Sequence, residues 1–179
     1  MRALVVYESM YGNTHEVATA IGDGLGDAAD IAVDVVSLHD VSADRLDDVD
    51  LLVVGGPTHA HGMSREATRQ SAEEAIAKPD NSLSLDPDAV GDGVREWLQS
   101  IGESTARAAA FDTRVDISPM LSGRASRGIG KQLRHHGYRL VADPESFLVT
   151  KDTHLEPDEH ARARAWGAQL GRQLDAGGH

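Results

Sequence analysis

The chain has 179 residues, 40% of them hydrophobic, which is enough to bury the core of one soluble domain. It contains no cysteine, so disulfides, thiol catalysis and cysteine-bound metal clusters are excluded. Its net charge of -12 disfavours binding to nucleic acid and would steer a basic partner toward the protein. A generally acidic, solvated surface without such a partner would account for the same net charge. No apolar run approaches the roughly 20 residues of a membrane span, and a strand begins too early to leave room for a signal peptide. We therefore expect a cytoplasmic protein with a single domain over residues 1–179.

An apolar strand followed by a hydroxylated turn opens the chain. Residues 3–7 form an uninterrupted apolar run, which is typical of a strand buried on both faces. The turn at residues 9–14 then leads into a helix, whose free N–H groups and dipole favour an anion. Ser9 and Thr14 can add hydroxyl donors, and Gly12 lets the backbone approach closely. This turn is predicted to bind phosphate.

Strands and helices alternate through the next part of the chain. The first helix carries apolar residues four apart, and Gly24 and Gly26 are expected to end it. A β-branched run at 31–38 predicts the second strand, placed at a sheet edge by its Asp34, and a short helix is expected within 41–49. The all-apolar run at 51–57 predicts the third strand. Ser64 is expected to cap a helix that ends near residue 78.

The second half continues the same alternation. Residues 79–92 are rich in Asp, Ser, Gly and Pro and form either a surface loop, which we favour, or a lid. The later elements expected from the sequence are a helix at 93–101, a strand at 106–111, a long loop at 112–127, a helix at 126–136 ended by Gly137, and a final helix at 156–174. Residues 138–141 and 146–150 are either one interrupted strand or two short strands.

Five alternations of strand and helix predict an α/β fold, a three-layer sandwich with a five-stranded parallel sheet and right-handed crossovers. Ligands of such sheets bind beyond the carboxyl ends of the strands, where the strand order reverses. The loops after the first, third and fourth strands are therefore predicted to form the site.

The turn at residues 9–14 has neither the ending of a Walker A loop nor the glycine spacing of a dinucleotide fingerprint. Its Ser-Met-Tyr-Gly-Asn-Thr sequence resembles the phosphate loop of flavodoxins, with the pattern Ser/Thr-x-Thr/Tyr-Gly-Asn/x-Thr between strand one and helix one. The Leu-Val-Val-Gly-Gly-Pro-Thr sequence at 52–58 resembles the family's approach to its first isoalloxazine loop. The resemblance covers nearly the whole chain and implies a flavodoxin-like strand order of 2-1-3-4-5, with FMN at the switch point.

The resemblance also implies the residues that bind FMN. The phosphate would lie on the turn, where the cofactor-binding residues are Ser9, Met10, Tyr11, Gly12, Asn13 and Thr14. The ribityl chain and ring would be bordered by Pro57, Thr58 and His59. The pyrimidine edge would lie along Asp112, Thr113 and Arg114, and a basic group there would favour the anionic reduced flavin.

These features leave three functions open. One is an FMN protein that transfers electrons to a redox partner protein or a small acceptor, for which the acidic charge of the chain is suited. The second is an NAD(P)H-dependent quinone reductase of the flavodoxin-like group. It is favoured by an aromatic content of only 4% and by His59 and His61 at a loop where electron-carrying flavodoxins often have an aromatic residue. The third is a flavin-less binding or regulatory module. We find no catalytic nucleophile–base set and expect no metal site.

Overall fold

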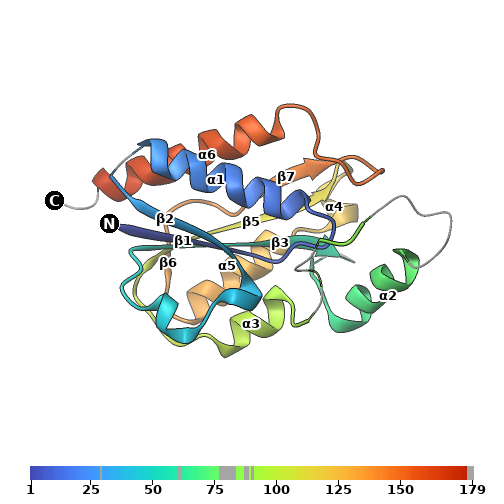
Figure 1. The fold of residues 1–179 in the computed structure, drawn as a ribbon, viewed down its shortest axis with the longest axis horizontal. Coiled ribbons are helices and arrows are strands. Elements are labelled where there is room, and N and C mark those ends of the chain that lie inside the picture. Colours follow the sequence, from blue (N-terminus) through green and yellow to red (C-terminus); the bar gives the residue numbers. More distant parts are fainter. Residues whose placement is uncertain (29, 60–61, 77–83, 87–88, 90, 177–179) are drawn as a thin grey trace.

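The computed structural model describes residues 1–28, 30–59, 62–76, 84–86, 89 and 91–176 (Figure 1). Its strands are β1 (Arg2–Tyr7), β2 (Ala32–Ser37), β3 (Leu51–His59), β4 (Gly62–Met63), β5 (Arg107–Val115), β6 (Arg139–Leu140) and β7 (Glu145–Val149). Its α-helices are α1 (Asn13–Ala28), α2 (Glu66–Ile76), α3 (Val94–Ser100), α4 (Pro119–Ser122), α5 (Ala125–His135) and α6 (Glu159–Ala176). Two 3₁₀ turns follow β2: Leu38–Asp40, and Ala43–Leu46, which stands where a short helix was expected within 41–49.

The parallel sheet has the order β2-β1-β3-β5, and its last position is shared by β6 and β7, which both pair with β5. The predicted order 2-1-3-4-5 is therefore confirmed, with the fifth strand in two pieces. Pro144 precedes β7, and a proline has no N–H for the ladder, which accounts for the interruption. β2 forms an edge, as predicted, and β4 adds a short antiparallel hairpin to the end of β3.

Two helical layers cover the sheet, so the predicted three-layer sandwich is confirmed. Helices α1 and α6 lie on one face, and α3 and α5 lie on the other (Figure 1). Successive residues of β1 point to opposite faces, which puts Val5 in the core beneath α1 and α6 and Leu4 in the core above α3 and α5. Because both faces are buried there, the central strands β1 and β3 have no polar alternation.

Three local predictions were wrong, and long-range packing explains two of them. Gly24 and Gly26 do not end the first helix, which continues to Ala28. Gly24 lies so close to α6 that an added Cβ would be 1.9 Å from the carbonyl oxygen of Arg164. Ser64 does not cap α2, because it is fully buried and its Oγ accepts a hydrogen bond from Arg69. The fourth predicted strand continues beyond residue 111 to Val115.

Candidate functional site

A cavity of about 200 Å³ lies at the carboxyl ends of β1, β3 and β5. Nine of the twelve predicted cofactor-binding residues line it: Met10, Tyr11, Asn13, Thr14, Pro57, Thr58, His59, Thr113 and Arg114. Sequence reasoning missed three further lining residues, Val115, Val149 and Thr153. Two of these, Val115 and Val149, are the last residues of β5 and β7. The rule that the carboxyl ends of neighbouring parallel strands meet at one edge of the sheet could have identified them.

The turn between β1 and α1 is shaped by its own hydrogen bonds. The Oγ of Ser9 accepts from the N–H of Gly12 at 3.1 Å, and Gly12 has a φ of 90°, in the region that favours glycine. An added Cβ at Gly12 would meet nothing nearer than 4.0 Å, so the backbone is open on that side. The turn thus exposes the N-terminus of a 16-residue helix to an approaching anion.

Thr14 links this turn to β5. Its Oγ1 lies 2.8 Å from the Oγ1 of Thr113, and both side chains are buried. Each hydroxyl carries one proton and two lone pairs, so one proton serves their mutual bond and the other is left for a further acceptor. Next to it, the Nδ2 of Asn13 donates to the carbonyl of Thr153 at 3.0 Å, which joins the turn to the segment after β7.

Arg114 supplies a donor to the cavity wall. Its Nη1 donates to the carbonyl of Ile117 at 2.8 Å, which fixes the loop after β5. Only 8% of the residue is exposed, and its Nε has no hydrogen-bond partner among the described residues. Arg114 thus lines the cavity and has a buried donor that no described group satisfies, so pairing this donor needs an acceptor from outside the described residues.

Asp112 lies apart from the cavity wall. Its buried carboxylate accepts a hydrogen bond from the N–H of Ser126 at 2.7 Å, in the first turn of α5. Burial raises the pKa of Asp112, while the N–H and hydroxyl of Ser126 act in the opposite direction. On the same helix the N–H of Ala125 donates to the Oγ1 of Thr58 at 2.9 Å. The side chain of Asp112 therefore anchors α5, and its neighbour Thr113 faces the cavity.

His59 ends β3 and pairs with Gly62 across the β3–β4 hairpin. Burial lowers the pKa of the His59 imidazole, and the nearby Arg69 guanidinium lowers it further. The imidazole is therefore neutral at neutral pH. His61, the other histidine of this loop, lies outside the described residues.

A contact that the sequence did not suggest lies beside the turn. The N–H of Asp86 donates to the carbonyl of Met10 at 2.8 Å, and its Oδ2 lies 3.4 Å from the Nδ1 of His15. The ring of His15 in turn stacks on Tyr7 at 4.6 Å between centroids. This part of the irregular stretch 79–92 therefore covers the turn; much of the remainder lies outside the described residues.

Together the doubly wound sheet and the anion-binding turn at its switch point define a nucleotide-binding α/β protein. A family model described as Flavodoxin matches residues 5–112, which is more than half of the chain. The chain belongs to the flavodoxin family, and FMN is the cofactor of that family. It is accordingly an FMN-binding, electron-transferring flavodoxin-like protein.

Solved structures match the fold along the whole chain. A flavodoxin from the domain Archaea is 23% identical, with a TM-score of 0.68 over 98% of this chain and 99% of that one. Oxidised Flavodoxin 1 from Bacillus cereus is 18% identical, with a TM-score of 0.64 over 99% of both chains. The rubredoxin oxygen:oxidoreductase of Desulfovibrio gigas is 15% identical, with a TM-score of 0.66, and the match covers 98% of this chain and 36% of that one. Among the described residues, no helix combines the length and apolarity needed to cross a membrane.

Proposed function

We propose that the cavity holds FMN, with nine of the twelve predicted residues lining it and the other three shaping its walls, and that the protein passes electrons from FMN to a redox partner protein. The phosphate is assigned to the turn at 9–14, where the N-terminus of α1 and the Thr14–Thr113 hydroxyl pair offer donors. Arg114 and His59 are assigned to the flavin, on the strength of their place in the cavity wall. Ser9, Gly12 and Asp112 do not line the cavity and act by shaping its walls. Bound FMN supplies the redox chemistry.

One observation favours a protein as the acceptor. Apart from Met1, the large hydrophobic residues exposed in the described chain all lie in one short segment after β5: Val115, Ile117, Met120 and Leu121. Val115 lines the cavity, so the segment forms part of its rim, and Met120 is 90% exposed. Apolar side chains exposed together beside a redox site mark a surface that a partner covers.

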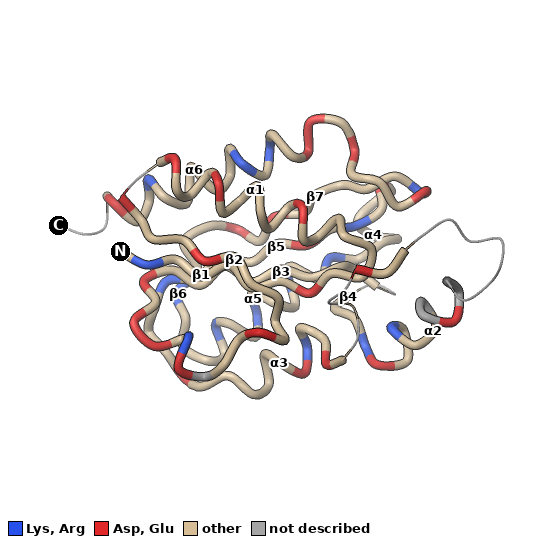
Figure 2. The backbone as a smooth tube through the Cα atoms, in the orientation of Figure 1, with Lys and Arg blue, Asp and Glu red and all other residues tan. Residues whose placement is uncertain are grey.

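Charge supports a basic partner. Acidic residues outnumber Lys and Arg by 29 to 17 and are spread over both helical layers (Figure 2). The field of such a surface speeds the approach of a positively charged protein, and rising salt weakens the effect.

The proposal is tested first by the visible spectrum of the purified protein and by titration of FMN into protein stripped of cofactor. A colourless protein that takes up no FMN would refute it. With FMN bound, electron transfer to cytochrome c, used as a basic probe, is then followed without oxygen. We expect the rate to fall as salt rises. It should also fall several-fold in Met120→Ser/Leu121→Ser, with Gln173→Ser as the control at an exposed, uncharged position outside this rim.

A second candidate is an NAD(P)H-dependent quinone reductase. Among the described cavity residues, Tyr11 and His59 alone have aromatic rings, so the wall has few such side chains to cover a flavin. Rapid oxidation of NAD(P)H on addition of a quinone, with slow reduction of cytochrome c, would favour this candidate.

A further inference from the structure

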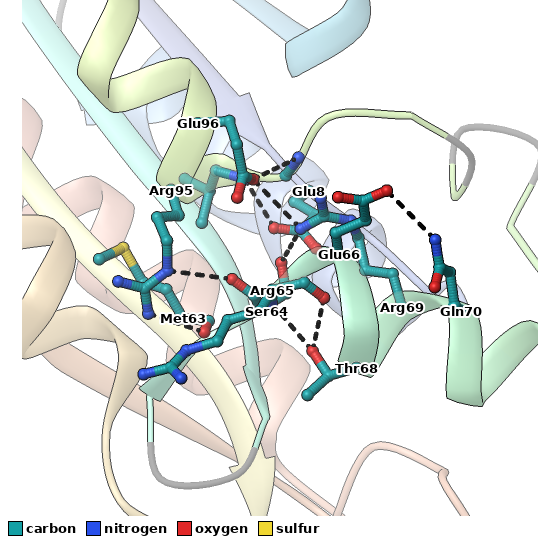
Figure 3. A network of polar contacts seen from close by, with 12 residues as sticks. Glu8, Met63, Ser64, Arg65, Glu66, Thr68, Arg69, Gln70, Arg95 and Glu96 are labelled. Atoms are coloured by element: carbon teal, nitrogen blue, oxygen red, sulfur yellow. Dashed lines mark hydrogen bonds and ion pairs between the residues drawn. The ribbon is translucent and has the colours of Figure 1, made fainter.

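A buried polar network lies behind the β3–β4 hairpin that carries Thr58 and His59 (Figure 3). Arg69 of α2 is 5% exposed, and its Nη1 donates to the Oγ of Ser64 at 3.0 Å. The same Nη1 lies 3.2 Å from the Oε2 of Glu96 on α3. A guanidinium this deeply buried is stable only with such partners, so its position is closely fixed.

Further contacts tie the same hairpin to the core. Arg95 of α3 donates from Nη2 to the carbonyl of Met63 at 3.1 Å and from Nε to the carbonyl of Ser64 at 3.3 Å. Glu8, at the end of β1 and 4% exposed, accepts from the N–H of Val94 at 2.8 Å. Its carboxyl group faces the Arg69 side of the network (Figure 3); burial raises the pKa of this group, and the charge of Arg69 acts in the opposite direction. A hairpin whose second strand has two residues has little stability of its own, so these contacts set its position.

We propose that Arg69 is a positioning residue for the cofactor: from outside the cavity it fixes, through Ser64, the hairpin that presents Thr58 and His59 to FMN. This inference rests on the proposed function, since it assigns FMN to the cavity. Arg69 does not line that cavity, and it acts through the residues that do.

The same guanidinium also acts on His59 through its charge. Burial lowers the pKa of His59 and Arg69 lowers it further. Ionisable groups on the elements around the hairpin include Glu8, Arg65, Glu66, Arg69, Arg95, Glu96, Asp112, Arg114, Arg124 and Arg127. Without Arg69 the pKa of His59 should rise toward its ordinary range, and acid would then place a cation on the cavity wall.

Two variants separate position from charge. Ser64→Ala removes the hydrogen bonds of this hydroxyl to Arg69 and Glu8 and keeps the charge of Arg69, so FMN should bind about ten-fold more weakly at every pH. Arg69→Met removes both the Arg69–Ser64 hydrogen bond and this charge, so FMN should bind about ten- to a hundred-fold more weakly at pH 8. In Arg69→Met the pKa of His59 should be higher than in the wild type. Part of the lost affinity should be recovered as the pH falls through this pKa, because an imidazolium attracts the anionic ligand. Dividing each dissociation constant by that of the wild type cancels the titration of the FMN phosphate.

Controls make the outcome decisive. Arg65→Met removes an exposed arginine four residues away and should leave FMN binding unchanged. Arg69→Lys keeps the charge and should abolish the pH-dependent step, and so should His59→Asn placed in the Arg69→Met background. If Arg69→Met does not fold, the test depends on Ser64→Ala and Arg69→Lys. Wild-type protein that does not bind FMN refutes the proposed function. If the wild type binds FMN, and the dissociation constants of Ser64→Ala and Arg69→Met are both within two-fold of the wild-type value at all pH values, only the role of Arg69 is refuted.

Discussion

Two glycines of α1 should respond in opposite ways to the same substitution. Gly24 faces α6, where an added Cβ would lie 1.9 Å from the carbonyl oxygen of Arg164 and 2.9 Å from the N of Ala168. Gly26 is exposed on the same helix, and an added Cβ would meet nothing within 4 Å. Gly24→Ala should therefore destabilise the fold, and Gly26→Ala should stabilise it.

The magnitudes follow from these distances. A carbon and a carbonyl oxygen approach to about 3.3 Å at closest, so Gly24→Ala forces the two helices apart by about 1.4 Å. Both neighbours are backbone atoms, which cannot rotate away, and overpacking of this kind costs about 3 kcal/mol or more. Gly26→Ala gains about 0.5–1 kcal/mol because alanine is the better helix former.

Thermal and urea unfolding followed by circular dichroism would measure both effects. For a chain of this length, a loss of about 3 kcal/mol lowers the melting temperature by about 6–12 °C, and Gly26→Ala should raise it by about 1–4 °C. Gly167, where an added Cβ would lie 2.1 Å from the carbonyl oxygen of Ile21, provides an independent second case from the α6 side. Gly24→Ala protein as stable as Gly26→Ala protein would refute the close approach of α1 and α6.

Three further predictions concern the site. Thr14→Val removes the hydroxyl next to Thr113 and should weaken FMN binding by about 1–3 kcal/mol in a fluorescence titration, and unchanged affinity would contradict the phosphate assignment. Asp86→Asn removes a negative charge beside the turn, so FMN should bind about five-fold more tightly at low salt; an effect that salt does not reduce would exclude the electrostatic cause. Burial raises the pKa of Asp112, so the folded state holds its proton to higher pH and this group costs stability above its unfolded pKa. Asp112→Asn should thus gain in melting temperature relative to the wild type near pH 7 and lose that advantage toward pH 4, and a gap that widens in acid would contradict the assignment.

Local chemistry made the turn at 9–14 and the sheet predictable. An apolar strand, a hydroxylated turn and a helix follow one another within a few residues, and each depends mainly on its neighbours in sequence. Parallel pairing then carries the ends of β1, β3 and β5 to one edge. This rule placed the loop after the fourth predicted strand in the site, and the resemblance to flavodoxins pointed to Thr113 and Arg114 within it.

Contacts between distant parts of the chain were not predictable in this way. Gly24 looks like a helix terminator until α6, about 140 residues later, packs on it. Serine is a residue type that often caps helices, but the hydroxyl of Ser64 accepts a hydrogen bond from the buried Arg69 instead. The anchoring role of Asp112 could have been found by extending the strand, since alternation puts Asp112 on the face of Ala110, toward α5, and puts Thr113 on the opposite face.

Cofactor affinity and fold stability depend on the same strand ends. Thr58 and Asp112 hold the N-terminus of α5, while Thr113, next to Asp112, holds the hydroxyl of Thr14 in α1. Residues that line the cavity thus also hydrogen-bond to a helix on each face of the sheet, α1 on one face and α5 on the other. A ligand that binds only the folded state at 100 times its dissociation constant stabilises it by about 2.7 kcal/mol. FMN in the cavity would contact Thr14 and Thr113 on the α1 side and Thr58 on the α5 side. The added free energy of unfolding should therefore oppose the opening of α1 and of α5 together, and the two helical layers should unfold as one unit in the presence of FMN.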